Sequence, residues 1–71
     1  MFMKAQEWLA SVQANPNSMS QRKVSTVETW DGGVEGLTEL AREKGVHLIM
    51  LEDDHGNELI AASNRPFRVL C

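Results

Sequence analysis

The stretch TWDGGVEGLTELAREKGVHLIMLEDD, residues 29–54, decides the fold of this chain. Its first half carries apolar residues at the spacing that forms one stripe on an α-helix, namely Val34, Leu37, Leu40 and Ala41. Gly45 follows at the left-handed position where helices commonly stop. The pattern therefore predicts a helix over about residues 32–44 that buries this stripe.

The start of this helix and the segment after it carry equally local signals. Asp31 can act as the N-cap, because its carboxylate can accept hydrogen bonds from backbone N–H groups of the first turn. Glu35 in that turn favours the positive end of the helix. After Gly45, the run Val46 to Leu51 is apolar on both alternating faces. We expect a strand over about residues 46–52, central in a sheet and at least partly covered on both sides.

The first third of the chain predicts one helix and one strand. A helix over about residues 3–14 is indicated by an apolar stripe, formed by Ala5, Trp8, Leu9 and Val12. It ends before Pro16, and we interpret Trp8 as a core anchor rather than a partner contact. The β-branched residues of VSTVETW favour a strand over about residues 23–30. Its imperfect alternation is typical of an edge strand.

The last third predicts a hairpin and a final short strand. Turn-forming residues from Asp53 to Asn57 separate the apolar run from a second strand over about residues 58–62. A last strand is expected over about residues 67–70. The fold class is therefore α+β, in the order α-β-α-β-β(-β), as a single domain over residues 1–71. We expect two helices packed on a three- or four-stranded, mostly antiparallel sheet.

Length and cysteine content limit how such a domain is stabilised. The chain has 71 residues and a single cysteine, Cys71, so no intramolecular disulfide can form. This composition favours a reducing, cytoplasmic setting. A domain of this size buries little surface, which makes a homodimer a reasonable source of further burial. The aliphatic run after Gly45 is far shorter than the about 20 residues that span a bilayer, so no membrane segment is expected.

The sequence offers no set of catalytic, cofactor-binding or metal-binding residues. Cys71 has no neighbouring base, and His47 reads as an ordinary strand histidine. His55 lies among Asp53, Asp54 and Asn57, but the segment lacks the ligand order and closing glutamate of a calcium loop. The Gly32-Gly33 pair belongs to no phosphate-binding motif. We therefore expect a protein that is not an enzyme and binds no cofactor or metal.

Charge distribution is the feature that points to a function. Residues 28–58 contain nine acidic and two basic residues, a net charge of −7, whereas the whole chain carries −3. Four acids spaced four residues apart line one side of the predicted helix, namely Asp31, Glu35, Glu39 and Glu43. Their spacing of about 6 Å is comparable to that of nucleic-acid phosphates. With Glu52, Asp53 and Asp54 they form the candidate partner-binding set.

These acids favour a non-enzymatic protein-binding module that docks onto a basic protein surface. In size and charge, the chain resembles the small inhibitors carried by phages and mobile elements, the anti-CRISPR proteins included. That resemblance implies a regulator or inhibitor that blocks a basic nucleic-acid-binding surface of a host protein complex.

Three alternatives remain open at this stage, and in the first the four acids are simply the solvated face of an amphipathic helix. A nucleic-acid-binding protein could use four cations, Arg22, Lys23, Arg65 and Arg68, if they meet in space. The net acidity and the absence of aromatic residues interleaved with these cations argue against it. The chain could also be a structural or assembly subunit of a larger complex.

Overall fold

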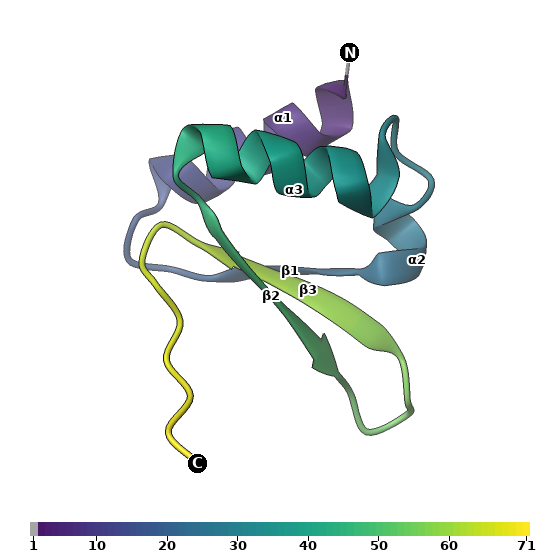
Figure 1. Cartoon of the computed structure of the whole chain (residues 1–71), viewed down its shortest axis with the longest axis vertical. Coiled ribbons are helices and arrows are strands. Elements are labelled where there is room, and N and C mark those ends of the chain that lie inside the picture. The colour runs from purple at the N-terminus through teal and green to yellow at the C-terminus, as the bar shows by residue number, and fades with distance from the viewer. Residues whose placement is uncertain (1) are drawn as a thin grey trace.

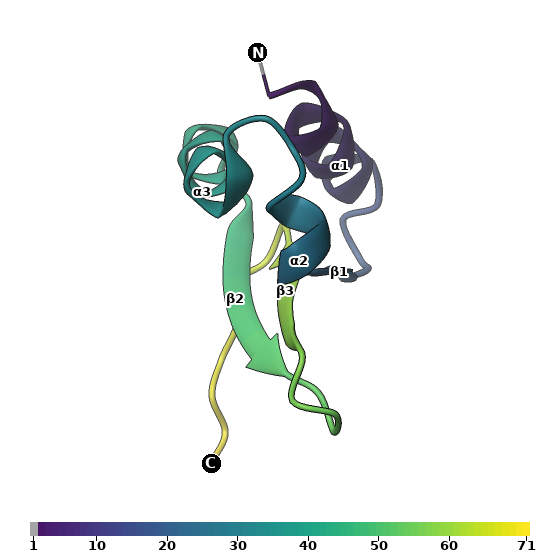
Figure 2. The same cartoon turned by 90° about the vertical axis from the view of Figure 1, so that its right-hand side faces the viewer.

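A computed structural model describes residues 2–71 as three helices packed on a three-stranded antiparallel sheet, which confirms the predicted α+β class (Figure 1). The elements are α1 (Met3–Ala14), β1 (Ser20–Lys23), α2 (Val24–Val27), α3 (Gly33–Lys44), β2 (His47–Glu52) and β3 (Glu58–Ser63). The strand order is β1-β3-β2. None of the described helices is long and apolar enough to cross a membrane. Figure 2 shows α1 and α3 above the sheet, with the β2–β3 hairpin extending beyond them.

Helix α1 has the predicted bounds and buries the predicted stripe, Ala5, Trp8, Leu9 and Val12. It packs against α3 and β3. Trp8 is a core residue, only 5% exposed, and its indole N–H donates a hydrogen bond to the Ser20 hydroxyl at 2.9 Å. Trp30 meets the Trp8 ring edge to face at a centroid distance of 5.8 Å, which is a favourable aromatic geometry. Trp8 therefore joins α1 to β1 and to the segment before α3.

Helix α3 also has the predicted extent, but its first turn differs from the prediction. Gly32 and Gly33 both have positive φ, and this turn leaves Asp31 outside the helix and exposed. Instead, the backbone N–H of Val34 donates a hydrogen bond to the Glu28 carboxylate at 3.1 Å. The prediction of Asp31 as N-cap was wrong, because only the two glycines can form this left-handed turn, and the turn brings Glu28 to the helix end. Gly45 ends the helix at φ 72°, as predicted.

The strand predicted over residues 23–30 was wrong in place and partly in type. Residues Ser20–Lys23 pair with β3, and Val24–Val27 form the helical turn α2. Val24 and Val27 are three residues apart, so a helical turn directs both toward the core, whereas a strand would place them on opposite faces. Val27 is fully buried and Val24 packs against the same core. Burial of this pair explains the imperfect alternation in the sequence.

The strand predicted to be central, β2, is an edge strand. The centre belongs to β3, where Ala61 and Ala62 are fully buried. The hairpin makes β2 a neighbour of β3 on one side, and β1 occupies the other side of β3. The apolar run of β2 is therefore covered less than expected, and Met50 is 51% exposed.

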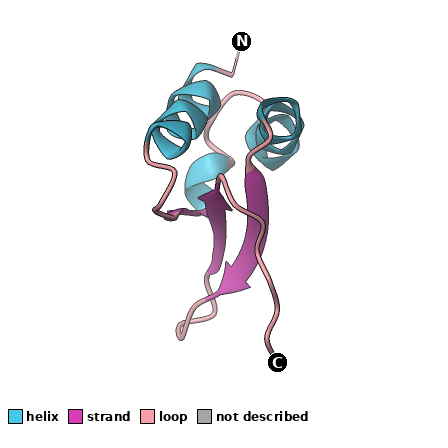
Figure 3. Ribbon diagram, turned by 90° about the vertical axis from the view of Figure 1, so that its left-hand side faces the viewer, coloured by secondary structure: helices cyan, strands magenta, loops and turns pink. Residues whose placement is uncertain are grey.

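The final strand predicted over residues 67–70 is also wrong. The segment after β3 is an extended loop in which Val69 and Leu70 are largely exposed (Figure 3). The side-chain amide of Asn64 donates to the backbone oxygens of Val12 and Gln13, at 3.0 and 3.3 Å. This contact fastens the end of β3 to the end of α1, while both sides of β3 are already paired. No edge of β3 is left for a further strand of this segment.

The capping contact can be tested with two substitutions that remove the same charge. Replacing Glu28 with alanine removes the acceptor of the Val34 N–H, and we expect a loss of about 1 kcal/mol in the free energy of unfolding. Asp31→Ala removes an exposed carboxylate that makes no cap, and we expect a change within about 0.5 kcal/mol. Urea unfolding followed by circular dichroism measures both. Equal losses would contradict the assignment of Glu28 as the cap.

The glycine turn before α3 also holds the N-terminal phenylalanine. A Cβ on Gly32 would lie 2.5 Å from Cε1 of Phe2, and one on Gly36 would lie 3.2 Å from the same ring. Gly45 has the same left-handed conformation, but a Cβ there would meet no atom within 4 Å. The two positions therefore separate backbone strain from steric contact.

We predict that Gly45→Ala costs about 1 kcal/mol through its left-handed φ alone. Gly32→Ala should cost at least about 2 kcal/mol, because displacement of Phe2 adds to that strain. Adding Phe2→Ala to Gly32→Ala should then cost less than the sum of the two single changes. Thermal and urea unfolding of the four variants supplies the cycle, and strict additivity would show that Phe2 does not pack on this turn.

Candidate interaction surfaces

The acids singled out in the sequence form two separate surfaces rather than one. Three of them lie exposed on α3 and are called the acidic row below, namely Glu35, Glu39 and Glu43. The other group lies at the end of β2 and in the hairpin turn that follows it, namely Glu52, Asp53 and Asp54. Figure 1 places α3 and the hairpin at opposite ends of the molecule. Asp31 belongs to neither group, because it lies in the turn before α3.

The acidic row is held in place by the packing of the opposite face of α3. Residues one helical turn apart share a side of the helix, and the buried side chains of Leu37 and Ala41 lie on the other side of α3 from the row. Both helix ends are fixed, by the Glu28 carboxylate and by the left-handed Gly45. Like charges four residues apart destabilise a helix by a few tenths of a kcal/mol each, so the row is not explained by helix stability.

Asp53 is a structural residue of the hairpin. Its Oδ1 accepts hydrogen bonds from the N–H groups of His55 and Asn57, at 2.9 and 2.8 Å, and its Oδ2 accepts one from the Asn57 amide at 3.3 Å. These bonds lower the pKa of the Asp53 carboxyl below its ordinary value of 3.8, with the backbone N–H of Asn57 as the main cause. Gly56, at φ 80°, completes the turn that was predicted from Asp53 to Asn57. Asp53 therefore stabilises the turn instead of standing free for a partner.

The lowered pKa gives a pH-dependent prediction. The folded-state pKa of Asp53 lies below the unfolded value of about 3.9. Ionised Asp53 thus stabilises the fold above that unfolded value, and the stabilisation is lost as the pH falls through the lower, folded-state pKa. We expect the free energy of unfolding to fall more steeply below pH of about 4 in the wild type than in Asp53→Asn, which cannot titrate. Urea titrations across this range measure the difference, and parallel curves would contradict the prediction.

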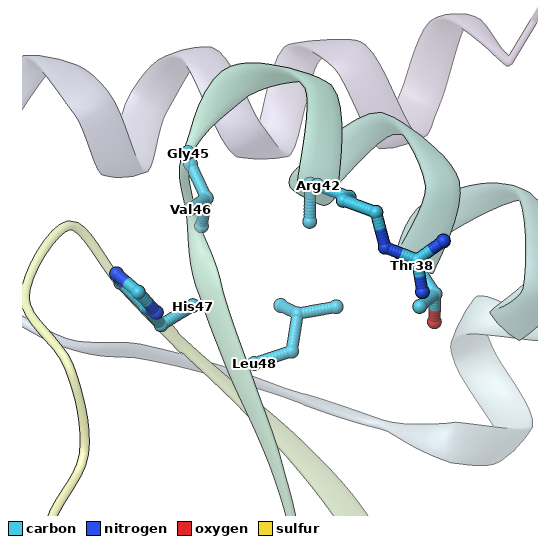
Figure 4. A pocket seen from close by; sticks show the side chains of 7 residues that line it. Thr38, Arg42, Gly45, Val46, His47 and Leu48 are labelled. Atoms are coloured by element: carbon cyan, nitrogen blue, oxygen red, sulfur yellow. The ribbon is translucent and has the colours of Figure 1, made fainter.

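A groove between α3 and β2 was not foreseen from the sequence. One part has a volume of about 330 Å³ and is lined by Thr38, Ala41 and Arg42 of α3 and by residues 45–48 of the following segment (Figure 4). Leu48 points toward α3 in this view, whereas His47 points to the other side of the strand. A second part of about 210 Å³ continues along β2 past Met50 and Ile60. The signal that could have revealed this groove is the Ala61-Ala62 pair, whose small side chains mark β3 as the central strand and leave β2 at the edge.

The four cations of the nucleic-acid alternative point in different directions. Arg22 lies with its guanidinium 5.4 Å from the Trp8 ring centroid, on the side of the helices. Lys23 is the next residue along β1, so its side chain points to the opposite face of the sheet. Arg65 donates a hydrogen bond to the side-chain oxygen of Asn17 at 3.1 Å, and Arg68 lies in the extended segment beyond it. The structure does not gather these residues into one basic patch.

Within residues 2–71, no group of three or more histidine, cysteine, aspartate or glutamate side chains is arranged to hold a metal ion. His55 and the neighbouring Asp54 are exposed in the hairpin, and Cys71 is exposed at the end of the chain. Comparison with protein-family models, curated proteins and solved structures found no match to this chain. The acidic row and the groove beside β2 are therefore the features of this chain that bear on function.

Proposed function

We propose that this chain is a non-enzymatic protein-binding module, a regulator or inhibitor that docks its acidic row onto a basic surface of a partner protein. The observation that carries the proposal is the row itself, three exposed carboxylates on one rigid helix. Glu35, Glu39 and Glu43 repeat at every fourth position, a rise of about 6 Å per step. Arginine and lysine side chains on a partner can pair with such a row without rearrangement of this chain.

Rigidity supports a recognition role because it lowers the cost of binding. Charges on a flexible segment lose conformational entropy when a partner orders them, whereas charges on a packed helix are already in place. The acidic row also borders a hollow of about 440 Å³, which is lined by Gln6 of α1 and by Leu40, Glu43 and Lys44 of α3. A partner side chain that enters this hollow would add apolar contact with Leu40 to the ionic contacts.

The spacing of the row indicates which basic surface fits best. Carboxylates at intervals close to those of phosphates can occupy the groove in which a protein binds nucleic acid. The size and charge of the chain, which resemble those of inhibitors from phages and mobile elements, fit the same role. The single cysteine fits a reducing, cytoplasmic site of action. A structural subunit of a larger complex would use the row in the same way but would bind permanently.

A charge-reversal pair with a matched control tests the proposal. Glu35→Lys/Glu39→Lys changes the row, while Glu7→Lys/Glu58→Lys changes the net charge equally at exposed positions away from it. The immobilised wild type is first used to isolate proteins from the source cell that bind at low salt, and the captured protein is purified. We expect the row variant to bind it at least about 100-fold more weakly, because like charges in an interface cost several kcal/mol.

The control variant should retain binding within about threefold, since screened charges outside an interface contribute little. Circular dichroism establishes that both variants fold. Equal binding by the wild type and the row variant, or an absence of any captured protein, would sink the proposal. If the wild type without a protein partner bound a DNA or RNA oligonucleotide, and if moderate salt abolished that binding, the nucleic-acid alternative would be favoured instead.

A further inference from the structure

The outer edge of β2 presents a defined set of unpaired backbone groups. The N–H of Asp53 donates to the backbone oxygen of Asn57, which continues the register in which His47 faces Ser63 and Leu51 faces Leu59. In an antiparallel pair, alternate residues direct both their N–H and C=O toward the neighbouring strand. The odd-numbered residues of β2 therefore bond to β3. The even-numbered residues, Leu48, Met50 and Glu52, direct theirs to the open edge.

This edge has the properties that proteins normally avoid. It is apolar, with Met50 51% exposed and Leu48 half-buried beside the groove under α3. Among residues 2–71, no strand covers it, since β2 ends the strand order. Exposed edges are usually shielded by charges, proline or bulges, because they accept strands from other chains. Here the strand itself carries none of these between His47 and Leu51.

We propose that the edge is occupied by β2 of a second copy of this chain, in an antiparallel pair with Met50 on the two-fold axis. Residues opposite each other then have numbers that sum to 100, so Met50 faces Met50 and Leu48 faces Glu52. All three outward-facing residues of each copy find hydrogen-bonding partners in this register. Side chains of opposed residues lie on the same face, so Ile49 of one copy meets Leu51 of the other. The two three-stranded sheets become one continuous sheet.

Charge complementarity favours this register. Glu52 of the second copy lies opposite Leu48, on the face covered by α3, and Arg42 lines the groove next to Leu48 (Figure 4). The Arg42 guanidinium is thus placed to pair with that carboxylate. Glu52 needs such a partner, because it directly faces Glu58 within its own sheet. On the opposite face, His47 meets Asp53 of the second copy.

Shifting the register by two residues so that Ile49 lies on the axis gives a poorer fit. Glu52 would then face Val46, whose N–H is already bonded to the backbone oxygen of Ala41 at 2.9 Å. The outer hydrogen bonds would be lost, and Glu52 would move away from Arg42. A shift of one residue would oppose side chains on different faces, which antiparallel pairing does not allow.

Analytical ultracentrifugation of the full chain over a range of concentrations tests whether it dimerises. We expect reversible association of 7.9 kDa chains. A single paired strand buries less than a standard interface, so the dissociation constant should be on the order of micromolar. Met50→Lys places two like charges at the axis and should weaken association at least about 30-fold. Met19→Lys is the matched control, because Met19 is equally exposed, at 51%, but lies before β1.

A charge exchange tests the register. Arg42→Glu and Glu52→Arg should each weaken the dimer about tenfold, and the double variant should recover it because each pair is restored with reversed signs. A merely structural role of either residue predicts no recovery. In a Cys71→Ser background, Met50→Cys should form an intermolecular disulfide on mild oxidation, since opposed Cα atoms lie about 5.5 Å apart. Leu48→Cys should not.

Three results would overturn the proposal: a monomer at all concentrations up to the millimolar range, a dimer that Met50→Lys leaves intact, or preferential cross-linking through Ile49→Cys. The inference does not depend on the proposed function, because Glu35 and Glu39 take no part in the edge. The row variant should dimerise normally, and Met50→Lys should still bind the basic partner as a monomer. Failure of one proposal is therefore distinguishable from failure of the other.

Discussion

The fold depends on the burial of β3 between two strands and beneath two helices. Ala61 and Ala62 are fully buried, and Ile60 is 3% exposed, so the last strand of the chain forms its centre. The small side chain of Ala62, on the face of the sheet that the helices cover, allows α1 and α3 to approach the sheet closely. The Asn64 amide then fastens the end of β3 to the last turn of α1. All pairing in the sheet passes through this one strand.

Local signals in the sequence predicted the helices and strands themselves. The order of the strands in the sheet depends on contacts between distant residues, which no local signal indicates. The bounds of α1 and α3 and the hairpin of β2 and β3 follow from periodicity, from Gly45 and from turn residues. The sequence did not predict that β3 is the central strand and β2 an edge strand. An apolar run indicates that a strand can be buried, but it does not indicate where the strand lies in the sheet. Glu28 as the cap was missed because two positive-φ glycines bring it to a helix six residues away in sequence.

The same limit of sequence-based prediction applies to the acidic residues proposed to bind a partner. Periodicity placed Glu35, Glu39 and Glu43 on one side of a helix, and they are exposed there. Sequence proximity, however, grouped them with acids that the hairpin carries to the opposite end of the molecule. The groove beside β2 arises only when α3 and β2 meet, so Arg42 could not be recognised as a groove residue. The acidic row on α3 and the outer edge of β2 lie on different elements, so docking of a basic partner and pairing through the strand edge use different residues.

The central position of β3 has a consequence for the order of folding. Both strand pairings require residues from Glu58 onward, so a growing chain holds no sheet until β3 has left the ribosome. Before that point, α1 and α3 are short amphipathic helices without a surface to pack on, and isolated helices of this length are marginal in water. The contacts that close the core join residues far apart in the chain, which slows their formation. Folding of the helices and the sheet should thus be concerted and begin only once β3 is available.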